Sequence, residues 1–211
     1  RREVVEMAIK ALKNVWHRGA VDADGKTGDG AGILLDIPID FFKEKIEETG
    51  HKPKPGKVAV GMIFLPRTDF GAQDAARSIV EAELLRGGFY IYGWRQVPIN
   101  VDVLGRKAAD TRPAIEQVIF RAPKSYDAAK LERELYIVRR RIEKRAIAEA
   151  IPSFYVCSLS GNTISYKGMF LAEQIDAFYP DLQDERFVSR AALYHQRYST
   201  NTFPQWWLAQ P

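Results

Sequence analysis

The alternation of apolar and polar residues along the chain divides it into helical and extended stretches. Apolar residues spaced three and four positions apart predict helices, and glycines, prolines or a capping residue such as Asp40 bound them. The predicted helices span residues 3–16, 40–50, 72–86, 127–148 and 171–179. Short runs rich in valine, isoleucine and aromatic residues predict strands. The predicted strands span residues 33–37, 57–65, 89–97, 115–122, 153–160, 163–167 and 191–194.

Two short connections decide how these elements are joined. Gly161-Asn162 lies between two predicted strands and is typical of a hairpin turn, so part of the sheet is expected to be antiparallel. Gly19 follows the first helix, which predicts a left-handed glycine closing that helix. Helices interleave with strands and no repeat or low-complexity linker interrupts them. The pattern therefore predicts one domain, an α/β sandwich with helices over sheets rather than a purely parallel sheet.

Composition narrows the class of protein without choosing a function. Of the 211 residues, 46% are hydrophobic and 27% are charged, and a net charge of +4 results from 31 basic and 27 acidic residues. The single cysteine, Cys157, excludes an intrachain disulfide framework and a cysteine-based zinc site, and it is typical of a reducing compartment, here the cytoplasm. No apolar run approaches the roughly 20 residues of a membrane span. The sequence starts inside a helical pattern and stops in an apolar stretch, so we expect a fragment.

Three local features could carry chemistry, and each also has a plainer interpretation. The glycines from Gly25 to Gly32 could cradle a phosphate with backbone N–H groups, or could simply form a tight connection into the next strand. The loop lacks the Gly-Lys-Ser/Thr of a P-loop, and a strand follows it where a dinucleotide fingerprint requires a helix. The basic residues from Arg139 to Arg145 could bind nucleic acid, but neighbouring glutamates favour an ion-paired helix surface. Cys157, in an apolar run, is more typical of a core residue than of a nucleophile.

A polar cluster follows the last predicted strand. Its arginine could grip a carboxylate or a phosphate with two parallel hydrogen bonds, although a strand end with a solvated arginine would give the same pattern. Arg18, beside the Gly19 turn, is a second candidate that could converge with this cluster. The cluster contains Arg197, Ser199, Thr200 and Asn201.

Several segments together resemble one known family. They are Trp16-His17-Arg18-Gly19-Ala20, Thr27 to Ile33, Tyr92 to Arg95, Phe154 to Ser160, Tyr166 to Met169 and His195 to Pro204. In this order and spacing they resemble the N-terminal glutaminase domain of the large (alpha) subunit of bacterial glutamate synthase, a class II (N-terminal nucleophile) glutamine amidotransferase. The resemblance covers essentially the whole chain, residues 1–211.

The resemblance implies a fold, an activity and partners. The fold is a four-layer αββα sandwich of the N-terminal nucleophile hydrolase type, incomplete here at both ends. The activity is hydrolysis of L-glutamine to glutamate and ammonia, which is channelled to a flavin domain of the same polypeptide and used there to make glutamate from 2-oxoglutarate. FMN, an iron–sulfur cluster and the FAD- and NADPH-binding small (beta) subunit belong to other parts of that enzyme, and no cofactor, metal, nucleic acid or membrane partner is expected for this domain.

The resemblance also assigns roles residue by residue. Arg197 would hold the α-carboxylate of glutamine, with Thr200 as a second contact and Ser199 and Asn201 in the same motif. Arg18 would order the surroundings of the nucleophile.

The sequence also departs from the family. The family's nucleophilic cysteine precedes the first helix, whereas no cysteine precedes Glu3 here. Its oxyanion-hole Asn-Gly pair and the aspartate for the α-amine follow the segment that ends this sequence. We therefore expect the chain to carry part of a glutamine site and to be inactive alone. The alternative is a phosphate- or nucleotide-binding α/β module that uses Gly25 to Gly32.

Overall fold

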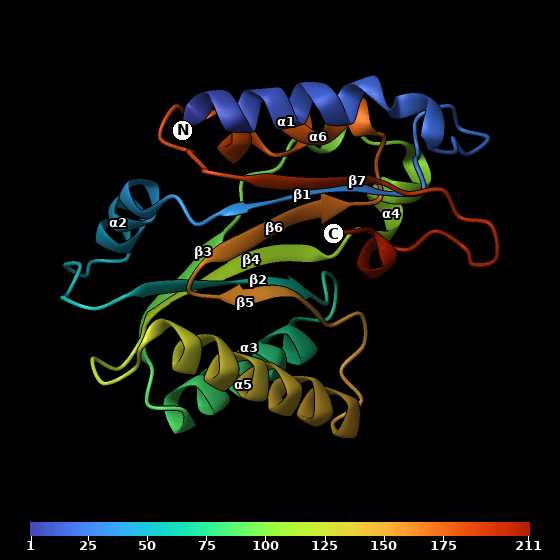
Figure 1. Cartoon of the computed structure of the whole chain (residues 1–211). Coiled ribbons are helices and arrows are strands. Elements are labelled where there is room, and N and C mark those ends of the chain that lie inside the picture. Colours follow the sequence, from blue (N-terminus) through green and yellow to red (C-terminus); the bar gives the residue numbers. More distant parts are fainter. The chain divides into compact units, whose positions relative to one another are not determined.

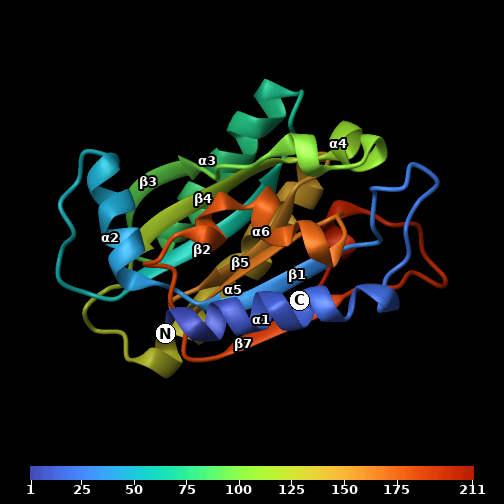
Figure 2. The same cartoon turned by 90° about the horizontal axis from the view of Figure 1, so that it is seen from above.

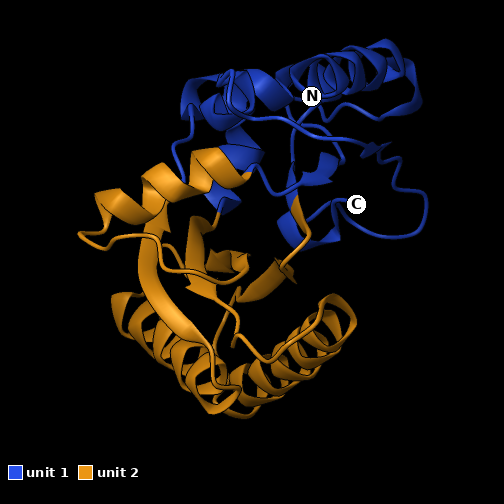
Figure 3. Cartoon of the chain, turned by 60° about the vertical axis from the view of Figure 1, so that its left-hand side comes forward, with its two compact units in different colours: residues 1–38, 97–112, 165–211 blue, residues 39–96, 113–164 orange.

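The structure, a computed structural model, describes residues 1–211 and divides into two compact units (Figure 3). Unit 1 contains residues 1–38, 97–112 and 165–211, and unit 2 contains residues 39–96 and 113–164. Each unit combines helices with antiparallel strand pairs, which confirms the predicted mixture of helices and antiparallel strands. None of the helices is both long enough and apolar enough to cross a membrane.

Unit 2 is built on a four-stranded sheet of order β3-β4-β2-β5, in which each neighbouring pair is antiparallel (Figure 1). All eight positions of β2 are buried, which explains why its sequence is an uninterrupted apolar run. Two long helices, α3 and α5, pack side by side on one face of this sheet. The elements are α2 (Ile39–Glu48), β2 (Val58–Leu65), α3 (Phe70–Arg86), β3 (Tyr90–Gln96), β4 (Ala114–Arg121), α5 (Ala128–Ala148) and β5 (Tyr155–Ser160).

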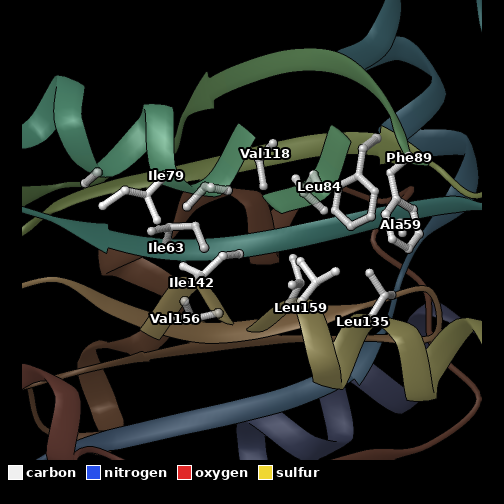
Figure 4. Packing of buried hydrophobic residues seen from close by; sticks show 14 of the residues in the cluster. Ala59, Ile63, Ile79, Leu84, Phe89, Val118, Leu135, Ile142, Val156 and Leu159 are labelled. Atoms are coloured by element: carbon white, nitrogen blue, oxygen red, sulfur yellow. The ribbon is translucent and has the colours of Figure 1, made fainter. Parts of the chain in front are cut away.

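The core of unit 2 lies between this sheet and its two helices (Figure 4). Ile63 from β2 and Val118 from β4 meet Ile79 from α3 and Ile142 from α5 in one buried cluster. Both helices begin where the sequence offers an aspartate: Asp69 accepts a hydrogen bond from Ala72 N at 2.9 Å, and Asp127 accepts one from Lys130 N at 2.7 Å. Asp40, the predicted cap of the shorter helix, instead lies inside α2.

Unit 1 carries a three-stranded sheet of order β6-β1-β7, with β1 and β7 antiparallel. In both views α1 runs along β7 and β1 (Figures 1 and 2). It buries one apolar face, formed by Val5, Ala8, Ile9 and Leu12. The elements are α1 (Arg2–Asn14), η1 (Trp16–Arg18), β1 (Ala31–Asp36), η2 (Val101–Val103), α4 (Arg106–Thr111), β6 (Thr163–Gly168), η3 (Ala172–Gln174), α6 (Ile175–Phe178), η4 (Pro180–Gln183), β7 (Ala192–Gln196) and η5 (Trp206–Leu208). The first two residues of β6 fall in unit 2.

A buried lysine fastens the last residues of the chain to this sheet. Lys167 of β6 is only 2% exposed, and its ammonium donates hydrogen bonds to the carbonyl oxygens of Ala209 at 2.7 Å and Trp207 at 3.2 Å. Trp206 is buried as well, and its indole N–H donates to Ala108 O at 3.1 Å. The segment around η5 is therefore an integral part of unit 1.

The predicted hairpin at Gly161-Asn162 is wrong. The strand before the turn, β5, belongs to the four-stranded sheet, and the strand after it, β6, belongs to the three-stranded sheet. Polar side chains direct the turn: Ser160 Oγ accepts from Asn162 N at 2.9 Å and donates to Glu132 at 2.9 Å, while Glu132 also accepts from Gly161 N. The turn thus follows contacts with a distant helix rather than pairing of its two flanking strands.

The predicted left-handed closure at Gly19 is also wrong. Helix α1 ends at Asn14, a short 3₁₀ turn follows, and Gly19 has an extended backbone with φ −96° and ψ 159°. Any residue adopts that conformation, so the reason for glycine at this position must be space rather than backbone geometry.

Candidate functional site

The two polar segments singled out from the sequence meet at one end of the β1–β7 pair in unit 1. In the register of this pair Ala31 lies opposite Gln196. The pairing continues one step further, because Arg197 N donates a hydrogen bond to Gly30 O at 2.8 Å. The glycine-rich loop and residues 197–204, which we call the arginine loop, are therefore direct neighbours.

The guanidinium of Arg197 is only partly used by the protein. Its Nη2 donates to the hydroxyl of Thr202 at 2.5 Å, whereas its Nη1 is buried and has no hydrogen-bond partner. Ser199 Oγ, two residues away, is likewise buried without a partner. An unmet buried polar group costs about 1–3 kcal/mol, so such groups need a reason. Two of them in one short loop indicate a place where a polar ligand would complete the hydrogen bonding.

A buried carboxylate holds the middle of the arginine loop. Asp29, only 7% exposed, accepts a hydrogen bond from Ser199 N. Asp29 lies in the glycine-rich loop, so this bond joins the two predicted features directly. Gly30, the next residue, has φ +133°, a conformation that favours glycine and carries the chain into β1.

The glycine-rich loop is folded around its own aspartate rather than around an anion. Asp24 accepts hydrogen bonds from the Thr27 hydroxyl at 2.6 Å, Thr27 N at 2.7 Å and Lys26 N at 3.0 Å. These bonds, with the Thr27 hydroxyl contributing most, hold the pKa of the Asp24 carboxyl well below its usual range. Gly25 N and Asp29 N also donate to backbone carbonyls. Four N–H groups of the loop, those of Gly25, Lys26, Thr27 and Asp29, are therefore already used, which argues against the phosphate-binding interpretation.

The remaining candidates of the cluster lie in more open positions. Thr200 and Asn201 are exposed, in a part of the arginine loop without regular structure, and Ser199 is half-buried. Arg18 lies on the surface in η1, and its side chain makes no hydrogen bond or ion pair. The segments that carry Arg18 and Arg197 contact each other instead through the adjacent residues, because Gly19 packs against the side chain of Gln196.

The other two features described from the sequence lie in unit 2. Cys157, in β5, is 8% exposed, in agreement with the core interpretation. On α5, Arg139 pairs with Glu143 at 2.9 Å, and Arg145 pairs with Glu83 at 3.1 Å. These ion pairs support the solvated, paired helix surface and not a nucleic-acid interface. No three side chains of histidine, cysteine, aspartate or glutamate gather into a possible metal site.

Sequence reasoning missed three residues of the site. Asp29, Gln196 and Thr202 all act through partners that are distant in the chain or that depend on the loop conformation. The only signal in the sequence was that Gln196 is a polar residue two positions after an apolar run, where a strand enters a polar cluster. That signal does not reveal which backbone groups its amide reaches.

Comparison with known proteins gives this arrangement a family. The chain is 62% identical over 211 residues to the glutamate synthase [NADPH] large chain of Azospirillum brasilense, covering 100% of this chain and 14% of that protein. It is 44% identical over 211 residues to the ferredoxin-dependent, chloroplastic glutamate synthase of Spinacia oleracea, covering 99% of this chain and 13% of that protein. It is 40% identical over 210 residues to the glutamate synthase [NADPH] large chain of Bacillus subtilis, covering 99% of this chain and 14% of that protein.

The chain thus spans only 13–14% of the length of these relatives. The resemblance to glutamate synthase large chains expected from the sequence is confirmed over the whole chain. Residues 1–211 also match the family described as glutamine amidotransferases class-II. The chain therefore belongs to the class II glutamine amidotransferases.

Proposed function

We propose that this chain forms the substrate-holding part of a glutaminase site in a glutamate synthase large chain. The site would bind L-glutamine, whose amide nitrogen is released as ammonia and passed to a flavin domain of the same polypeptide. The single observation that carries the proposal is the buried, unpartnered Nη1 of Arg197 beside the unpartnered Ser199 Oγ. A carboxylate would satisfy both the positive charge and the missing acceptor.

Within this proposal each residue of the arginine loop has a defined task. Arg197 binds the α-carboxylate through Nη1, while Thr202 orients the guanidinium by accepting from Nη2. Ser199 Oγ donates a further hydrogen bond to the ligand, and the exposed Thr200 and Asn201 contact its outer side. The planar fork of an arginine matches the geometry of the glutamine carboxylate.

The reacting groups are proposed to come from elsewhere. In class II amidotransferases a cysteine thiolate attacks the amide carbonyl, and the resemblance places that cysteine before Glu3, outside these 211 residues. Burial of Cys157 in β5 of unit 2 argues against its being the nucleophile. Arg18, exposed and without a side-chain partner, is available to order the nucleophile's surroundings.

The proposal extends to the rest of the enzyme only through the family. The donor set of this chain does not fit an iron–sulfur cluster, because such clusters need several cysteine thiolates and the chain has one cysteine. The iron–sulfur cluster therefore belongs to another part of the proposed cytoplasmic enzyme. The resemblance implies the same for FMN and for the FAD- and NADPH-binding small subunit. The resemblance also implies that residues 1–211 are part of one amidotransferase domain, whose two sheets form the inner layers of an αββα sandwich.

Replacement of Arg197 tests the proposal directly. In a polypeptide that contains this chain and hydrolyses glutamine, Arg197→Ala should raise the glutamine KM, because it removes charge-assisted hydrogen bonds worth about 1.5–3 kcal/mol, or roughly 10- to 100-fold in affinity. Arg197→Lys should recover only part of the loss, since it keeps the charge but not the fork. Arg190→Ala is the matched control, because Arg190 precedes the same strand and pairs with Asp36 on the surface.

Two results would contradict the proposal. An unchanged glutamine KM in Arg197→Ala would remove this residue from carboxylate binding. Glutamine turnover by residues 1–211 alone that disappears in Cys157→Ser would show that the nucleophile lies within this chain.

A further inference from the structure

The side chain of Gln196 joins three segments at the base of the arginine loop. It is the last residue of β7 and is 9% exposed. Its Oε1 accepts a hydrogen bond from Ala172 N at 3.0 Å, and its Nε2 lies 3.4 Å from the carbonyl oxygens of Gly30 and Arg197, to which it donates. Both ends of the amide are thus used, and one of its partners is the main chain of Arg197 itself.

Gly19 lies directly against this amide. A Cβ atom at Gly19 would lie 2.1 Å from Nε2, 2.7 Å from Cδ and 3.1 Å from Cγ of Gln196. Because the φ of Gly19 is −96°, its backbone does not require glycine. The side chain of Gln196 is therefore the physical reason why position 19 has no side chain.

This contact connects the two arginines of the candidate site. Gly19 follows Arg18, and Gln196 precedes Arg197, so one buried amide donates a hydrogen bond to the main chain of Arg197 and packs against the main chain beside Arg18. We propose that Gln196 is a positioning residue: with Gly19 as its close-fitting neighbour, it sets the placement of Arg197 relative to the Arg18 segment and thereby the affinity for the ligand carboxylate. This inference rests on the proposed function of Arg197.

Positioning and plain packing predict different measurements. Packing alone would lower thermal stability and leave the surviving folded molecules with normal ligand affinity. Positioning raises the glutamine KM, because a displacement of about 1 Å in a binding group costs up to roughly 100-fold in activity. Because Gly19 and the Gln196 side chain are in steric contact, substitutions at these two positions should have non-additive effects on the glutamine KM.

The test uses a full-length enzyme that contains this chain, assayed with glutamine and, separately, with ammonia as the nitrogen source. Gln196→Met keeps a similar side-chain volume but removes both ends of the amide, and it should raise the glutamine KM at least about tenfold with unchanged ammonia-dependent activity. Gly19→Ala should act in the same direction, because its methyl group displaces the amide. In Gln196→Ala, which leaves room for that methyl group, adding Gly19→Ala should change the KM less than twofold.

Controls separate the possible failures. Gln183→Ala removes another glutamine of unit 1 that donates to a carbonyl, Asp176 O at 2.8 Å, and should leave the KM unchanged. A normal glutamine KM in Gln196→Met would overturn the positioning role. So would a Gly19→Ala substitution that raises the KM by the same factor in the wild type and in Gln196→Ala. A lowered Tm with a normal KM would assign Gln196 to packing alone. If Arg197→Ala also leaves the KM unchanged, the proposed function fails; if only Gln196→Met does so, the positioning role fails by itself.

Discussion

The buried carboxylate of Asp29 should control how firmly the arginine loop is held. Asp29→Ala removes the acceptor of Ser199 N and leaves that N–H without its partner in a half-buried position. Asp29→Asn keeps an oxygen that can still accept, but without the negative charge. The two variants therefore remove all or part of one charge-assisted hydrogen bond at the middle of the loop.

The magnitude follows from the strength of that bond. A hydrogen bond to a charged group contributes about 1.5–3 kcal/mol, so its loss shifts the equilibrium between the held and released loop by roughly 10- to 100-fold. The apparent ligand affinity falls with the fraction of molecules in which the loop is held, so this range is the upper limit for Asp29→Ala. A neutral acceptor is about half as strong, and Asp29→Asn should lose no more than roughly 3- to 10-fold.

Calorimetric titration with glutamine measures the affinity, and amide hydrogen exchange at Ser199 measures the hold on the loop. The affinity for glutamine should decrease from the wild type to Asp29→Asn to Asp29→Ala. The rate of amide hydrogen exchange at Ser199 should increase along the same series. Asp22→Ala is the control, because Asp22 belongs to the same connection but pairs with Lys107 at 2.7 Å. It should change neither quantity.

Two outcomes would refute this reasoning. Faster exchange at Ser199 with unchanged affinity would show that holding the loop does not matter for binding. Unchanged exchange in Asp29→Ala would show that the carboxylate does not hold Ser199 at all.

Two further predictions concern the glycine-rich connection. Gly30→Ala should lower the free energy of unfolding, measured in urea titrations, by more than Gly25→Ala does. Both glycines have positive φ, but of the two only Gly30 has an atom close to the added Cβ, namely Ala209 Cβ at 2.9 Å. Equal losses of unfolding free energy in the two variants would show that this contact is unimportant. Because the pKa of Asp24 is lowered from 3.8 in the folded state, its stabilising contribution is complete well above pH 3.8 and is lost as the pH falls below that value. The unfolding free energy of Asp24→Asn should therefore fall less than that of the wild type between pH 5 and about pH 3, and parallel curves would contradict the assignment.

The sequence predicted the elements of this fold better than their connections. The period of apolar residues located α5, predicted over residues 127–148 and observed from Ala128 to Ala148, because that signal is local. The turn at Gly161-Asn162 was misjudged because its geometry depends on Glu132, which is 29 residues away from Gly161. Local turn propensity cannot include such a partner.

The candidate site shows the same division between local and distant information. Arg197 and its neighbours stand out as a motif, whereas the proximity of the glycine-rich loop depends on β1–β7 pairing, with Ala31 opposite Gln196. The reason for glycine at position 19 also lies in that distant strand and not in its own backbone. Residues whose roles depend on such pairing could be found only in the folded chain.

The buried Lys167 has a consequence for chemical labelling. Its ammonium, 2% exposed, is held by the carbonyl oxygens of Trp207 and Ala209, so acylating reagents reach it only when residues 207–209 lift away from the sheet. Lys52 and Lys54, which are exposed, remain open to the same reagents at all times. The extent of modification at Lys167, divided by that at Lys52 and Lys54, therefore measures how often residues 207–209 detach from the sheet, and no added probe is needed.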